Sequence, residues 1–215
     1  LNADVFGFTW FHHDDKPCTY KNTLPVWSDT NLEGLGKSLS SPLWLANVRG
    51  ATPGQGISEA NTQPFTKDHL IFTHNGCLKP FDTTIKTQLL ELISNEIRAE
   101  INGDSDSLYL FALFKQHLLA NNNINDALIQ TMSDLKTICA DSIKALLNII
   151  LSDGKSIYAC RHAINDHCPS LYYLQENNSV YIASEPLSPN QDWQAFPEHT
   201  LIKFDRSGLI DSYDL

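Results

Sequence analysis

The sequence has no long apolar run and no excess of positive charge. One of its apolar runs, Leu146 to Leu151, has the length of a strand, well short of what a bilayer requires. The chain carries 15 Lys and Arg against 25 Asp and Glu, a net charge of −10. Nucleic acids and anionic membranes attract basic surfaces, so we expect neither as a partner. No basic start with an apolar continuation marks a secretory signal, and we expect a cytoplasmic protein.

Cysteine is scarce, and its distribution excludes a disulfide framework. The five cysteines are odd in number and show no paired spacing, so free thiols in a reducing compartment are expected. Two groups contain the residue types of metal ligands: His12 to Asp15, and the set Cys160, His162, His167 and Cys168. Neither has the spacing of a known metal motif. We therefore predict no metal site and no cofactor.

The order of the expected elements predicts an α+β fold in a single domain, residues 1–215. A strand is expected over 4–13, with Phe6, Phe8 and Trp10 on one face as sheet core. Three helices follow. The first is capped by Thr84 and ended by Asn102-Gly103, the second starts at Ser105 or Asp106, and the third runs through Ala127 to Ile138. Three hairpins complete the chain, with turns at Ser152–Lys155, Asn177-Asn178 and Arg206–Gly208.

The stretch from Leu43 to Phe81 concentrates the polar chemistry. Two expected strands, Leu43–Val48 and Leu70–Thr73, alternate in it with three polar groups: Arg49–Thr52, Asn61–Phe65 and His74–Gly76. Arg49 and an Asn75–Gly76 turn would lie where the strands end. A cation beside exposed backbone N–H donors suits an anionic ligand. The alternative is an ordinary hairpin turn and a solvated arginine.

These groups resemble a family pattern. The pattern has a strand ending in His-x-Arg, then Ala-Thr, Asn-x-His/Gln-Pro-Phe and Phe-x-His-Asn-Gly. The matching residues here are Asn47–Arg49, Ala51-Thr52, Asn61–Phe65 and Phe72–Gly76. The chain thus resembles the class II glutamine amidotransferases, which are N-terminal-nucleophile hydrolases. Within them it most resembles the small γ-glutamyl amidases of ergothioneine biosynthesis, chiefly through Thr19–Trp27. The resemblance covers nearly the whole chain and is weakest from about 119 to 146.

The resemblance implies a four-layer α/β/β/α sandwich of two antiparallel sheets and a γ-glutamyl amide as the small-molecule substrate. Asn75 and the Gly76 N–H would stabilise the oxyanion, and Arg49 with Thr52 would bind the substrate's α-carboxylate. His74 belongs to the same substrate-binding motif. Gly103–Ser107 resembles the family's Gly-x-Thr-Asp-Ser-Glu, with Leu108 in place of Glu. There Asp106 would bind the α-ammonium, although an acidic residue at a helix start is also a common N-cap.

The family nucleophile is an N-terminal Cys whose own α-amine acts as base. Leu1 to Trp10 resembles an element that lies well inside family members, so we expect a preceding segment that carries this Cys. Cys18 and Cys77 are internal and have no α-amine beside them. Neither is therefore a candidate nucleophile.

Three functions stay open at this stage. The favoured one is a hydrolase that releases glutamate from a γ-glutamyl amide. The enzymatic alternative is a glutaminase subunit that supplies ammonia to a partner synthase, or a glutathione-degrading relative. The third is a non-catalytic γ-glutamyl-binding protein. A homo-oligomer is compatible with all three.

Overall fold

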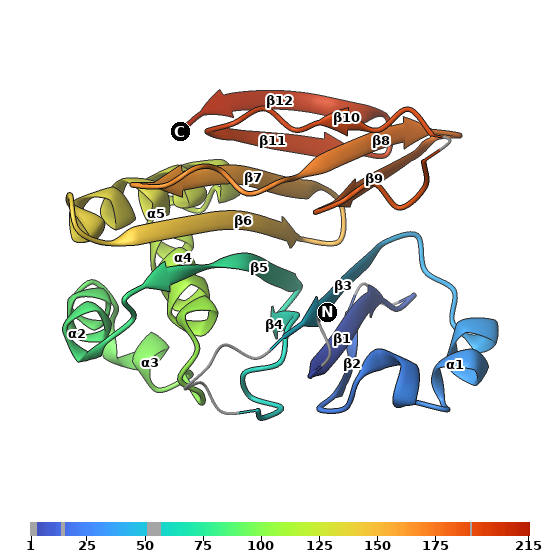
Figure 1. Cartoon of the computed structure of the whole chain (residues 1–215), viewed down its shortest axis with the longest axis horizontal. Coiled ribbons are helices and arrows are strands. Elements are labelled where there is room, and N and C mark those ends of the chain that lie inside the picture. The colour runs from blue at the N-terminus through green and yellow to red at the C-terminus, as the bar shows by residue number, and fades with distance from the viewer. Residues whose placement is uncertain (1–3, 14–15, 51–56, 190) are drawn as a thin grey trace.

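A six-stranded antiparallel sheet forms the centre of the molecule (Figure 1). The computed structural model describes residues 4–13, 16–50, 57–189 and 191–215. The spatial order of the strands is β12-β11-β7-β6-β5-β4. Their bounds are β4 Phe65–Lys67, β5 Leu70–Lys79, β6 Lys144–Ser152, β7 Ile157–Ile164, β11 Thr200–Asp205 and β12 Gly208–Asp214.

Helices cover one face of this sheet. They are α2 Thr83–Glu91, α3 Asn95–Arg98, α4 Asp106–Asn121 and α5 Ile124–Cys139. Because side chains alternate along a strand, every second residue of β5 and β6 meets the helices. Phe72 and Leu147 lie on that face and are completely buried with Leu110 and Leu135 of the helices. The main hydrophobic core is therefore between α2–α5 and the large sheet.

Two three-stranded sheets cover parts of the opposite face. One has the order β2-β1-β3, with β1 Val5–Phe11, β2 Pro17–Asn22 and β3 Trp44–Arg49. The other has the order β10-β8-β9, with β8 Tyr172–Glu176, β9 Ser179–Ala183 and β10 Gln194–Ala195. Phe11 and Leu45 of the first pack on Ile71, and Phe196 beside the second packs on Ile202.

The predicted α+β class with antiparallel sheets is confirmed, and the described strands form three sheets where two were predicted. Among these strands, β1–β3 pair only with one another and so do β8–β10. The two small sheets lie over different strands of the large one. Between β2 and β3 the chain forms only short helical segments, η1 Val26–Ser28 and α1 Leu32–Ser38 (Figure 1).

The aromatic residues of β1 do not form the interior that was predicted. Phe6 is buried, but Phe8 and Trp10 are only half-buried, whereas Phe11 on the other face faces the large sheet. The Phe8 ring lies 5.4 Å from Tyr20 and 6.1 Å from Trp44. These rings cover one another across β2-β1-β3, and the core side of β1 belongs to its odd-numbered residues.

The helices also depart from prediction at one place. The stretch expected as one helix from Thr84 to Asn102 forms two helices, α2 and α3. The first helix ends at its C-cap Leu92, and the second begins after its N-cap Ser94. The Ser94 side chain accepts from the Ile97 N–H, and its own N–H donates to Gln116 Oε1 of α4 at 2.8 Å. Asp82, not Thr84, caps α2. The other two helices and all three hairpins are found where they were predicted.

No helix among the described residues has both the length and the apolar character needed to cross a bilayer.

Candidate active site

Asn75 and Gly76 lie in the middle of β5, so the prediction of a turn at a strand end is wrong. β5 continues to Lys79 because β6 pairs with it without interruption, Asn75 facing Asn148 and Gly76 facing Leu147. Glycine is required here by a close backbone approach. A Cβ built on Gly76 would lie 1.8 Å from the Leu146 carbonyl oxygen and 2.8 Å from His74 Nε2.

Gly76→Ala is therefore expected to distort the β5–β6 ladder and lower the midpoint of thermal unfolding strongly. Overpacking commonly costs about 1–3 kcal/mol, and here the obstacle is backbone that a rotamer change cannot move. Gly36→Ala is the matched control, because nothing lies within 4 Å of its added Cβ. A Gly76→Ala protein as stable as the control would contradict this account of the strand.

A cavity of about 120 Å³ brings together most of the residues predicted to form the site. Its walls come from the end of β3, the middle of β5, the segment before β4 and the start of α4. Five of the six predicted residues line it: Arg49, His74, Asn75, Gly76 and Asp106. The sixth, Thr52, lies outside the described residues, and its role stays a prediction. Segments far apart in sequence thus meet at one small polar cavity.

The cavity has a cation and an anion in its walls. Arg49 is the last residue of β3, as predicted, and its Nη1 donates to the Asn61 carbonyl at 3.3 Å. Asp106 is 4% exposed at the first position of α4. Its Oδ2 accepts from the Leu78 N–H at 2.9 Å and its Oδ1 from the Ser107 N–H at 2.8 Å. A cavity with both charges suits a ligand that carries a carboxylate and an ammonium.

Asp106 does not cap α4; Ser105 does, and its Oγ accepts from the Leu108 N–H. In a capping box, a Glu three residues after the cap would accept from the cap's own N–H. Leu108 cannot do this. Asn61 replaces it, because its Oδ1 accepts from the N–H groups of Asp104 at 3.0 Å and Ser105 at 3.2 Å. The carboxylate of Asp106 is thereby left to face the cavity.

His74 has both ring nitrogens engaged inside the protein. Its Nε2 donates to the Leu146 carbonyl at 2.8 Å, and its Nδ1 lies 2.9 Å from Ser107 Oγ. Burial is the main cause that lowers the pKa of His74, and the Asp106 charge opposes it. The neutral ring, with Nδ1 accepting from Ser107, satisfies both contacts. His74 ties β5 to β6 and α4 at the edge of the cavity.

The side-chain amide of Gln63 makes the hydrogen bonds to the His74 backbone that a neighbouring strand would otherwise make. Its Oε1 accepts from the His74 N–H at 2.6 Å, and its Nε2 donates to the His74 carbonyl at 2.9 Å. The pairing of β4 with β5 places Phe65 opposite Phe72, so Gln63 is opposite His74 in the same register. β4 itself starts only at Phe65. The amide side chain continues the hydrogen bonding of the sheet into the cavity wall.

Gln63→Ala is expected to reduce the free energy of unfolding by about 1–3 kcal/mol, because it leaves buried backbone groups of His74 without partners. Denaturant unfolding followed by circular dichroism measures this. Gln130→Ala is the control, since Gln130 Nε2 makes one exposed bond, to Asp134. Equal stability of the two variants would show that the Gln63 amide has no such structural role.

The Asn75 side chain projects from the face of β5 opposite to His74. Its Nδ2 donates to Ser184 Oγ at 2.8 Å, just after β9. An amide nitrogen carries two hydrogens, so this bond leaves a second one for a ligand. Asn75 and Gly76 are both exposed and line the cavity. Ser184 was not predicted, because only the arrangement of the sheets brings it to a residue 109 positions away.

Cys77 follows the Asn-Gly pair but is poorly suited to be a nucleophile. Burial first, and then the Asp106 charge, raise the pKa of its thiol. A thiol with a raised pKa has little thiolate at neutral pH, and thiolate is the nucleophilic form. The prediction that Cys77 does not act as the nucleophile therefore agrees with its surroundings.

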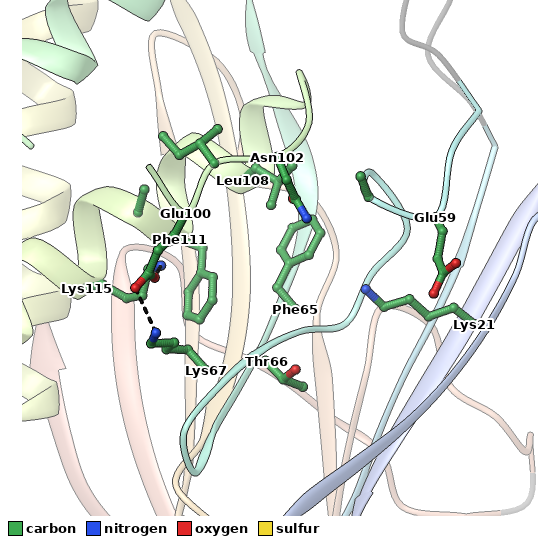
Figure 2. A pocket seen from close by; sticks show the side chains of 13 residues that line it. Lys21, Glu59, Phe65, Thr66, Lys67, Glu100, Asn102, Leu108, Phe111 and Lys115 are labelled. Carbon is green, nitrogen blue, oxygen red and sulfur yellow. Dashed lines mark hydrogen bonds and ion pairs between the residues drawn. The ribbon is translucent and has the colours of Figure 1, made fainter. Parts of the chain in front are cut away.

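A larger cavity, of about 520 Å³, lies apart from the predicted residues (Figure 2). Phe65 and Phe111 stack in its wall with ring centroids 6.3 Å apart, and Lys67 and Lys115 both bind Glu100, at 2.7 and 2.6 Å. Two of the three lysines in its lining thus already have an acidic partner. The larger cavity is nevertheless not the candidate site. The predicted pair of opposite charges, Arg49 and Asp106, lines the smaller cavity together with Asn75–Gly76.

A sequence comparison decides the family. Residues 2–175 match the family model of the class-II glutamine amidotransferases. The chain belongs to the class-II glutamine amidotransferases. The match includes every element that lines the smaller cavity, from β3 through β5 to the start of α4.

A yeast relative and two solved structures are similar to almost the whole chain. The probable glutamine amidotransferase DUG3 of Saccharomyces cerevisiae is 28% identical over an alignment of 257 residues. The alignment covers 98% of this chain and 71% of that protein. A class-II domain protein from Silicibacter pomeroyi superposes with a TM-score of 0.79 at 25% identity, covering 97% of this chain and 90% of that one. The glutamine phosphoribosylpyrophosphate amidotransferase of B. subtilis shares the fold, with a TM-score of 0.74, 16% identity, and coverage of 99% and 43%.

Proposed function

We propose that this amidotransferase-family protein hydrolyses γ-glutamyl amides and binds the glutamyl group in the smaller cavity. The observation that supports this most is the meeting of Arg49 and Asp106 in one cavity with Asn75 and Gly76. A γ-glutamyl group has an α-carboxylate, an α-ammonium and a γ-carbonyl. The guanidinium of Arg49 suits the first, and the carboxylate of Asp106 suits the second. Thr52 would add a hydroxyl to the binding of the α-carboxylate.

In this proposal the reaction proceeds through an attacked γ-carbonyl. The oxygen becomes an oxyanion and needs donors held in place beforehand. Asn75 Nδ2, oriented by Ser184, and the Gly76 N–H are the donors we assign. The nucleophile is the N-terminal Cys of the full-length protein, with its own α-amine as base. The full four-layer α/β/β/α sandwich of the N-terminal-nucleophile hydrolases belongs to the same proposal.

The ergothioneine-type substrate rests on the Thr19–Trp27 segment. In the structure its Tyr20 hydroxyl and Asn22 amide both donate to Asp29 Oδ2, at 2.6 and 2.7 Å. These bonds, that of Tyr20 foremost, lower the pKa of Asp29. The segment therefore organises its own loop and does not line the smaller cavity. Within the proposal, it indicates kinship with those amidases, and the leaving amine has to be identified by assay.

The test is glutamate release by the full-length protein from a panel of γ-glutamyl amides, including glutamine and γ-glutamyl peptides. We expect hydrolysis that Cys→Ala at the mature N-terminus abolishes. Preference for a γ-glutamyl amide of a larger amine would support plain hydrolysis. Glutamine as sole substrate, together with a co-purifying synthase, would support ammonia supply. Binding of glutamate without turnover of any amide would identify a non-catalytic protein.

A further inference from the structure

Cys168, Glu198 and His199 meet at the surface on the side of the large sheet where β7 and β11 pair. Cys168 lies in the connection from β7 to β8, and Glu198 and His199 directly precede β11. One ligand atom from each of the three lies within 4.8 Å of the others. Cys168 Sγ is 3.8 Å from His199 Nε2. We propose that these three side chains bind a divalent transition-metal ion, Zn²⁺ or Co²⁺, as a site separate from the amidase cavity.

A tetrahedral ion sets the separation that its ligand atoms must reach. With a metal–sulfur bond of about 2.3 Å and a metal–nitrogen bond of about 2.0–2.1 Å, the two ligand atoms are separated by roughly 3.5 Å. In the structure Sγ lies 3.8 Å from His199 Nε2 and 3.9 Å from its Nδ1, so the Cys168 side chain has to turn toward Nε2 when the ion binds. Thiolate, imidazole and carboxylate together match the ligand preferences of zinc and cobalt rather than those of magnesium or calcium. The fourth position would be taken by water.

A neighbouring histidine holds the ring of His199. His199 Nδ1 lies 3.0 Å from His162 Nδ1, so these two nitrogens share one proton. When His199 carries it, Nδ1 donates to His162 and the lone pair of Nε2 is available to a metal. A ligating histidine usually donates its other N–H in this way, which fixes its tautomer and orientation. His162 is only 7% exposed on β7, which makes it a rigid acceptor.

Arg161 holds the two segments that carry the ligands. Its Nε donates to the Pro169 carbonyl at 2.7 Å, next to Cys168, and its Nη1 to the Phe196 carbonyl at 2.6 Å. Its Nη2 lies 3.2 Å from Glu198 Oε1, which leaves the other carboxylate oxygen for the ion. The thiolate and the carboxylate bring two negative charges to the divalent ion, and the Arg161 guanidinium adds one positive charge beside Glu198.

This inference departs from the prediction of no metal site. The earlier grouping of Cys160, His162, His167 and Cys168 included one ligand of the proposed set, Cys168, and its supporting residue, His162. The buried Sγ of Cys160 faces the Leu147 carbonyl at 3.6 Å instead. His199 and Glu198 lie about thirty residues further on, so no spacing motif could include them. The pairing of β7 with β11 brings them to Cys168.

The test is titration of the reduced, metal-free full-length protein with Co²⁺, followed by absorption spectroscopy. We expect one equivalent to bind, with a thiolate-to-cobalt charge-transfer band in the near ultraviolet that Zn²⁺ displaces. Cys168→Ser should abolish the band, and His199→Ala should weaken binding strongly. His162→Ala should weaken it by about 10–100-fold, as expected for a residue that orients a ligand.

The matched control is Cys18→Ser, because Cys18 is a half-exposed free thiol on β2 that belongs to no such ligand group among the described residues. It should leave the band and the affinity unchanged. Circular dichroism shows whether each variant is folded. If Cys168→Ser does not fold, His199→Ala and Glu198→Gln test the metal site independently. Absence of saturable binding, or a charge-transfer band that survives in folded Cys168→Ser, would overturn the proposal. The cobalt absorption does not depend on amidase activity, so the result tests the metal site independently of the proposed function.

Discussion

Arg49→Ala is expected to raise the KM for a γ-glutamyl amide strongly and to change kcat much less. The guanidinium at the end of β3 is the cation in the wall of the smaller cavity that we pair with the substrate's α-carboxylate. Losing one member of such a charged pair commonly costs about 2–5 kcal/mol. At 1.4 kcal/mol per tenfold, this is roughly a 30-fold to several-thousand-fold loss of affinity. Steady-state kinetics with a glutamate assay measures it.

Two further variants separate recognition from general disruption. Arg49→Lys should recover only part of the affinity, because an ammonium cannot reproduce the planar fork of the guanidinium. Arg98→Ala is the matched control, since Arg98 donates to the Ile93 carbonyl beside α3, away from the cavity. It should leave KM unchanged. Wild-type KM in folded Arg49→Ala would remove Arg49 from the substrate site.

Asn75→Ala is expected to lower kcat by about 10²–10³ while KM changes little. In the proposed mechanism its Nδ2 donates to charge that appears only when the γ-carbonyl is attacked, and loss of one oxyanion donor typically has an effect of this size. Asn75→Asp, which keeps the shape but loses the donor, should be at least as impaired. Single-turnover kinetics together with KM measures the effect on the chemical step.

Ser184→Ala is the companion variant, because Ser184 accepts from Asn75 at 2.8 Å and is expected only to orient it. Its kcat should fall less than that of Asn75→Ala, and combining the two changes should add little to the effect of Asn75→Ala alone. A large rise in KM with unchanged kcat in Asn75→Ala would instead make Asn75 a binding residue.

The predicted elements follow physical patterns that are local in sequence. Alternating aromatic and small residues marked β1, an apolar run marked β3, and turn residues such as Asn177-Asn178 marked the hairpins. Both of these asparagines have positive φ angles, 48° and 61°, which asparagine tolerates better than most residues. The residues of the candidate site were found through motifs, and five of the six then proved to line one cavity.

What could not be predicted depends on contacts between distant segments. Asn75–Gly76 has the composition of a turn, yet β6 pairs with β5 from Ile71 to Lys79 and keeps it extended. Gln63 belongs to the Asn61–Phe65 motif, but its structural role depends on His74 lying opposite it in register. Ser184 reaches Asn75 only because of where β9 ends. The number of sheets likewise depends on which strands find partners.

A crystal structure of the full-length protein with L-glutamate, the product of the proposed reaction, tests the central claim most directly. The account predicts glutamate in the smaller cavity, with its α-carboxylate on Arg49 and its α-ammonium on Asp106. One γ-carboxylate oxygen should lie within hydrogen-bond distance of Asn75 Nδ2 and the Gly76 N–H. Glutamate bound instead in the larger cavity beside Phe65 and Phe111, or in the smaller one with its α-carboxylate away from Arg49, would contradict it.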